Sequence, residues 1–134
     1  MKRFYSYSLF LISITFLFAS CGFGDAAEKA EKQVDKYHNF LKAGNETAML
    51  KMVHEDGMKE DAEGFKALIH KMASETKITK IEKSVGFNTS INNGVATVRL
   101  NYTLYDENHG AITEEIVMQD SKDGAMKIIA LNYK

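Results

Sequence analysis

The sequence of 134 residues contains no proline, no tryptophan and one cysteine, Cys21. A single cysteine excludes an internal disulfide, and without proline the turns depend on glycine, asparagine and aspartate. The formal net charge of −1 excludes a strongly basic protein that binds nucleic acid. The sequence has no glycine-rich phosphate loop, no Cys-His zinc spacing and no nucleophile elbow. It therefore predicts one small domain without a cofactor or a bound metal.

Residues 1–20 have the order of a secretory leader. Lys2 and Arg3 precede an uncharged run from Phe4 to Ser20, and without those two basic residues the net charge becomes −3. The alternative is a retained transmembrane helix, which needs about 20 strongly apolar residues. This run is shorter and contains several hydroxyl residues, so a cleaved signal peptide is favoured.

The segment Leu17-Phe18-Ala19-Ser20-Cys21 resembles the lipobox of a bacterial lipoprotein, although Phe18 stands where leucine is usual. The resemblance implies cleavage before Cys21 and attachment of acyl chains to that residue, and two or more chains suffice for stable anchoring. It implies a protein of the bacterial cell envelope, tethered to a membrane that we expect to be the outer one, on its periplasmic or surface side. We divide the chain into a signal peptide (1–20), the lipidated cysteine with a short linker (21–25) and one domain (26–134).

Three amphipathic helices are predicted in the first half of the domain. Asp25 is expected to cap the first, whose apolar residues recur every three or four positions and which ends at Gly44. Asn45 is expected to cap the second, and Gly57 to end it. The third covers about residues 60–75. Each helix has one apolar stripe, so each needs a surface to cover.

A meander of four antiparallel strands is predicted from Thr76 onward, because the apolar residues begin to alternate and Asn-Gly, His-Gly and Asp-Gly turns separate the runs. A two-residue turn at Asn93-Gly94 predicts four pairs on one face: Ile91 with Ala96, Thr89 with Val98, Phe87 with Leu100 and Val85 with Tyr102. The last turn, with Gly124 left-handed, predicts three more: Met118 with Ile128, Ile116 with Ala130 and Glu114 with Asn132. The predicted fold class is α+β, with three helices packed on the apolar inner face of a curled four-stranded meander.

The outer face of the predicted meander is not uniformly polar. It collects four apolar side chains on the last two strands: Val117, Ile129, Leu131 and Tyr133. An apolar patch of this kind favours association. The sequence therefore predicts a homodimer through the outer sheet face.

The order of helices and meander, the segment Ala96-Thr97-Val98 after an Asn-Gly turn and the closing segment 122–128 are similar to the nuclear-transport-factor-2-like (cystatin-like, SnoaL-like) superfamily, in particular to small lipoproteins of that fold. The resemblance covers residues 26–134, with Met126 where many members have an aromatic residue. It implies a cone with a pocket between sheet and helices. Members use this pocket for catalysis, ligand binding or association, and the fold does not choose among them.

Tyr102, Glu114 and Asn132 are predicted to form one row across the apolar inner face. A carboxylate in such a pocket could act as a general acid or base, with Tyr102 and Asn132 as hydrogen-bond donors. The alternative is that the row lies at the open rim of the cone, where Glu114 reaches water.

The four histidines, His38, His54, His70 and His109, lack the helical spacing of a metal-binding pair. His54 is expected at a solvated helix end. We therefore favour a lipid-anchored envelope protein without enzymatic activity, whose cone binds a small apolar or amphipathic ligand or whose surface binds a partner protein. The alternatives are a cofactor-free lyase or isomerase that uses Glu114, and a structural or inhibitory envelope module.

Overall fold

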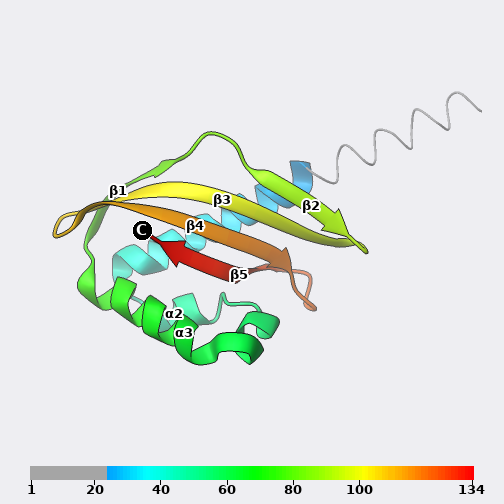
Figure 1. Ribbon diagram of the computed structural model, residues 1–134, viewed down its shortest axis with the longest axis horizontal. Helices are drawn as coiled ribbons and strands as arrows, with labels where there is room; N and C mark the ends of the chain where they lie inside the picture. The colour runs from blue at the N-terminus through cyan, green and yellow to red at the C-terminus, as the bar shows by residue number, and fades with distance from the viewer. Residues whose placement is uncertain (1–23) are drawn as a thin grey trace, which may run out of the picture.

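The computed structural model describes residues 24–134 (Figure 1). The predicted leader, the lipobox and Cys21 lie outside these residues. The architecture is α+β: helices precede an antiparallel sheet of five strands. The elements are a helix over 24–43, here called the N-terminal helix, then α2 (Glu46–Leu50), α3 (Glu55–Glu75), β1 (Ile78–Lys83), β2 (Asn88–Asn92), β3 (Val95–Asp106), β4 (Gly110–Asp120) and β5 (Met126–Tyr133).

The N-terminal helix buries the predicted stripe, which consists of Ala27, Ala30, Val34, Tyr37 and Leu41. Residues at this spacing lie on one face of a helix, so the other faces carry the charged side chains. The helix ends as predicted at Gly44, whose φ of +65° is readily adopted by glycine. Asp25 lies inside the helix and not at its cap.

The next two helices differ from the prediction at their junction. Asn45 caps α2 as predicted, because its side chain accepts a hydrogen bond from the Ala48 amide at 3.2 Å. Gly57 does not end that helix. It is buried within the first turn of α3, which begins after His54 and has a break in its helical backbone at Asp61.

The sheet has the strand order β1-β3-β4-β5, and β2 pairs with β3 beside β1. The predicted first strand of the meander is therefore interrupted. Residues 84–87 leave the ladder between β1 and β2, with Gly86 at a φ of +90°. The predicted pairs Ile91–Ala96 and Thr89–Val98 are confirmed, but Lys83 takes the predicted place of Val85 opposite Tyr102.

The loop over residues 84–87 exposes two side chains that the alternating pattern assigns to the inner face. Val85 is fully exposed and Phe87 is half exposed. The alternation continues through the sequence of this loop, but the hydrogen-bonded ladder that would orient these side chains does not.

The register between β3 and β4 is as predicted, with Leu104 opposite Ile112 and Tyr102 opposite Glu114. Between β4 and β5, the predicted pair Met118–Ile128 is confirmed, but a bulge at Val117/Met118 shifts the pairs beyond it. Ile116 therefore pairs with Leu131 instead of Ala130.

The bulge reverses which side chains at the end of β5 point to the inner face of the sheet. Glu114 pairs with Tyr133 instead of Asn132, because one extra residue in a strand reverses the alternation of the side chains that follow. Tyr133 and Leu131 pack against the core, and Asn132 is exposed. The predicted outer patch thus loses two of its four members to the inner face. The homodimer through that face stays a prediction.

The core lies between the inner face of the sheet and the helices, which occupy one side of it (Figure 1). The sheet contributes the predicted apolar row, of which Ile112 is half-buried and the rest are buried: Ala96, Val98, Leu100, Tyr102, Leu104, Ile116, Met118, Met126 and Ile128. Burying such side chains is the main favourable contribution to folding.

Candidate functional site

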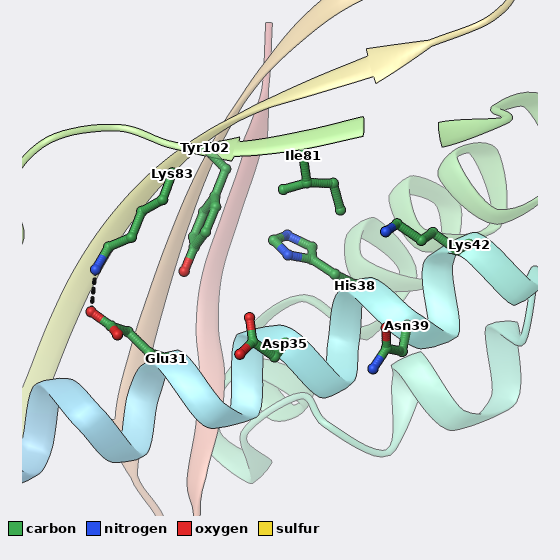
Figure 2. A pocket seen from close by; sticks show the side chains of 8 residues that line it. All are labelled: Glu31, Asp35, His38, Asn39, Lys42, Ile81, Lys83 and Tyr102. Atoms are coloured by element: carbon green, nitrogen blue, oxygen red, sulfur yellow. Dashed lines mark hydrogen bonds and ion pairs between the residues drawn. The ribbon is translucent and has the colours of Figure 1, made fainter. Parts of the chain in front are cut away.

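A cleft of about 420 Å³ lies between the N-terminal helix and strands β1 and β3 (Figure 2). The helix contributes side chains that recur at the spacing of one helical face, beside the buried stripe. The strands close the other side. The lining residues are Glu31, Asp35, His38, Asn39 and Lys42 from the helix, Ile81 and Lys83 from β1 and Tyr102 from β3.

His38 forms the buried floor of this cleft together with Tyr102. Its Nε2 lies 2.6 Å from Oε1 of Glu114, and the two residues are 4% and 0% exposed. The Tyr102 ring meets the imidazole edge-on, with 4.8 Å between ring centroids. The imidazole therefore has a carboxyl group behind it, an aromatic ring beside it and the cleft in front.

The hydrogen bond to Glu114 sets the chemistry that His38 offers. With Glu114 as a carboxylate, Nε2–H of the neutral imidazole donates, and Nδ1 keeps its lone pair. Nδ1 has no hydrogen-bond partner among residues 24–134, and the His38 side chain lines the cleft. A carboxylate that orients a histidine in this way prepares the other ring nitrogen to accept a proton or a hydrogen bond.

Glu114 is enclosed on its other side by two tyrosines. The hydroxyls of Tyr37 and Tyr133 lie 2.8 Å apart, and Tyr133 pairs with Glu114 across the sheet. Burial, and then the charge of Glu114, raise the pKa of Tyr133 well above its usual value. The Glu114 Oε2 atom has no hydrogen-bond partner of good geometry among the described residues. The Tyr133 hydroxyl also contacts the Glu114 carboxyl group and this contact contributes to the raised pKa of Tyr133, so His38 forms the best-defined hydrogen bond of Glu114 but not its only polar contact.

Charged side chains surround the mouth of the cleft. Lys83 and Glu31 form an ion pair across it, drawn as a dashed line in Figure 2. Asp35 and Lys42 form no ion pair with any residue from 24 to 134. Burial, and then the charges of Asp35 and Glu31, raise the pKa of Tyr102. The Tyr102 hydroxyl thus stays protonated at neutral pH and can donate a hydrogen bond.

Of the three predicted site residues, the structure brings Tyr102 and Glu114 together and places Asn132 on the opposite face. Glu114 does not lie at a wet rim, because it is fully buried behind His38. Sequence reasoning missed His38 as a site residue. The signal was present: His38 follows Val34 by four residues and precedes Leu41 by three, so it falls on the apolar stripe.

The other histidines have local structural roles. His54 is not a solvated helix end. It is buried and caps the start of α3, where Nδ1 accepts from the Asp56 amide at 3.1 Å and Nε2 lies 2.9 Å from the Asp120 carbonyl. His70 pairs with Glu46, and His109 with Asp106. In the described part of the chain, no cluster of histidine, cysteine and acidic side chains could hold a metal ion.

No helix within residues 24–134 has the length and apolarity needed to cross a membrane. No protein-family model matches the chain, and no relative is found among curated proteins.

Proposed function

We propose that the protein is a lipid-anchored envelope protein whose cleft binds a small polar or amphipathic ligand. The observation that carries the proposal is the buried His38–Glu114 pair at the floor of the cleft. Burying such a pair is unfavourable unless every polar atom is satisfied, and Oε2 of Glu114 has no hydrogen bond of good geometry among the described residues, only the contact with the Tyr133 hydroxyl. A pair that stabilises the fold so poorly is better explained by recognition at the cleft.

The lining of the cleft indicates what the ligand offers. His38 Nδ1 is suited to a hydroxyl or amide N–H group, and the Tyr102 hydroxyl to an acceptor oxygen. Asp35 and Lys42 lie on the same helical face, two turns apart, so a ligand with groups of both charges could contact both. A mainly polar lining favours a polar or amphipathic ligand over a wholly apolar one.

We further propose that the domain belongs to the nuclear-transport-factor-2-like superfamily. Helices that precede an antiparallel sheet and pack on one of its faces support this assignment. The broken first strand and the bulge in the last pair are compatible with it, because bulges bend sheets.

Ligand-observed NMR with a library of small polar fragments tests the binding function. Fragments that bind the wild-type protein should no longer show a binding signal with Tyr102→Phe, which removes the phenol hydroxyl, or with His38→Gln, which removes the imidazole. His70→Gln is the matched control, because His70 is exposed on α3. If no fragment binds, or if both cleft variants bind every hit as well as the control does, the proposal is wrong.

One observation favours a second candidate function. A carboxylate-oriented histidine with its other nitrogen facing a cleft is an arrangement suited to general base catalysis, so a cofactor-free lyase or isomerase would use His38 as the base. Glu114 would then be the positioning residue and not the base itself. The test is exchange of α-protons of small carbonyl compounds in heavy water, followed by NMR. General acid-base catalysis contributes roughly 10²–10⁴-fold, so His38→Gln should abolish any exchange above background.

The anchor has its own test. Membrane-extracted protein should begin at Cys21 and carry the mass of its acyl chains. Cys21→Ser should move the protein from the membrane fraction to the soluble fraction, because serine has no sulfur with which to form the thioether to the lipid. An intact leader with an unmodified Cys21 would contradict the proposed anchoring and leave the cleft experiments unaffected.

A further inference from the structure

Four large apolar side chains near the β2–β3 hairpin are exposed: Val85 at 106%, Phe87 at 51%, Ile91 at 42% and Val95 at 40%. We call them the hairpin patch. Val85 and Phe87 lie in the loop that precedes β2, and Ile91 and Val95 flank the Asn93-Gly94 turn. Most other large apolar side chains of the described domain are buried or half-buried. A group of exposed ones at a single edge therefore suggests an interaction surface.

The tip of the β2–β3 hairpin lies at the same end of the molecule as the first described residues of the N-terminal helix, and the loop before β2 arches beside the middle of β3 (Figure 1). Side-chain contacts link this loop to the helix. Lys83 pairs with Glu31 in the first half of that helix, and the Lys83 ammonium also lies 5.9 Å from the centroid of the Phe87 ring. The hairpin patch thus extends from a position beside the first half of the helix to the tip of the hairpin.

The length of chain between the helix and Cys21 limits how far a lipid could lie from the hairpin patch. Gly24 is the first described residue, three positions after Cys21. Three residues span at most about 11 Å. Lipid attached to Cys21 would therefore keep a bilayer within reach of the hairpin patch.

The geometry points to a lipid bilayer as the occupant of the hairpin patch: we propose that these side chains enter the interface of the membrane that holds the anchor and so orient the domain. This inference rests on the proposed anchoring at Cys21. Ile91 pairs with Ala96, whereas Val95 precedes Ala96, so their side chains point to opposite faces of the hairpin. A flat protein partner, or a second copy of the chain, would cover one face, whereas a lipid layer can surround both.

The absence of tryptophan from the sequence makes a direct test possible. Phe87→Trp and, in a separate chain, Val85→Trp place a single fluorophore in the patch. Asn108→Trp is the matched control, because it lies in the exposed turn beyond the other end of β3. Asn88 pairs with Arg99, seven residues before the end of that strand, so the control lies roughly 25 Å from position 87 at the rise of a strand. The full-length gene is expressed, and the membrane-extracted protein is reconstituted in vesicles of phosphatidylethanolamine and phosphatidylglycerol with brominated acyl chains.

Interfacial apolar side chains reach roughly 5–10 Å into the boundary of headgroups and acyl chains, so emission from positions 87 and 85 should fall by about half relative to unbrominated vesicles. Emission from position 108 should be unchanged. Acylated protein in which positions 87 and 85 are quenched no more than position 108 overturns the inference and leaves the anchor intact. An emission shift at position 87 that grows with protein concentration without vesicles indicates a second copy of the chain and also overturns it. An unmodified Cys21 in the mass spectrum removes the anchor, and the inference with it.

Discussion

The His38–Glu114 pair makes a quantitative prediction about stability. Removing the partner of a buried charged group typically costs about 3–5 kcal/mol, and loss of His38 would leave the Glu114 carboxylate buried without compensation. His38→Phe should therefore lower the free energy of unfolding by this amount. Glu114→Gln should cost less, about 1–3 kcal/mol, because the Gln carbonyl can still accept from Nε2–H.

Replacing both partners should have the opposite effect. Exchange of a buried charged pair for apolar residues of similar volume is often neutral or stabilising by about 1–4 kcal/mol. In this protein the pair has one hydrogen bond of 2.6 Å, and the second carboxyl oxygen has no hydrogen bond of good geometry beyond its contact with the Tyr133 hydroxyl, so the pair compensates its burial incompletely. The double variant His38→Phe/Glu114→Met should thus be at least as stable as the wild type, although His38→Phe alone is strongly destabilised.

Urea unfolding of residues 24–134, followed by circular dichroism at pH 7, measures these differences. With a slope of about 2 kcal/mol per molar urea, a loss of 3–5 kcal/mol moves the midpoint by roughly 1.5–2.5 M. If the double variant is as unstable as His38→Phe, the pair is required for the fold. Its burial is then explained by stability and no longer supports a binding or catalytic role. If both single variants stay within about 0.5 kcal/mol of the wild type, as surface changes do, the two side chains are not buried against each other.

Three further predictions concern polar contacts that stabilise the fold, and urea unfolding measures each. Burial alone would raise the pKa of Asp106, but hydrogen bonds from a backbone amide and from His109 outweigh it and lower that pKa. Asp106→Asn should cost about 1–2 kcal/mol at pH 7, and its difference from the wild type should shrink as the pH falls below about 4, where the carboxylate becomes protonated; a difference independent of pH would refute this. Asn45→Ala should cost about 1 kcal/mol through loss of the α2 cap, and Asn45→Asp much less. Tyr37→Phe and Tyr133→Phe should each cost about 1 kcal/mol, with the double variant costing less than their sum, because they share one hydrogen bond; strict additivity would mean that the two hydroxyls do not interact.

Local periodicity predicted much of the fold. Helical spacing identified the buried stripe of the N-terminal helix, and alternation with an Asn-Gly turn predicted the register of β2 on β3. The register of β3 on β4 depended on the assumption that Leu104 faces Ile112, which the structure confirms. These features depend on residues close in sequence, which is why they can be read without the fold. The same register correctly placed Tyr102 beside Glu114.

Two irregularities were not predictable from the pattern, and both affect the interpretation of function. The bulge at Val117/Met118 turns Tyr133 inward and Asn132 outward, and the apolar run from Ile128 to Leu131 is compatible with either orientation of the end of β5. The loop before β2 exposes Phe87, although its spacing fits the inner face. In each case the hydrogen bonds to the neighbouring strand set the position at which a residue is left unpaired. These hydrogen bonds cannot be read from the sequence of one strand.

The sequence by itself determined which residues of the N-terminal helix and of strands β3 and β4 face the core, where most turns lie and that Glu114 stands on an apolar face. Only the tertiary structure decided that His38, 76 positions away, meets Glu114 across the core and that a cleft opens in front of it. The physical reason is the range of the interactions. Periodicity reports which side of an element is buried, whereas the partner of a buried polar group depends on how the helix packs against the sheet.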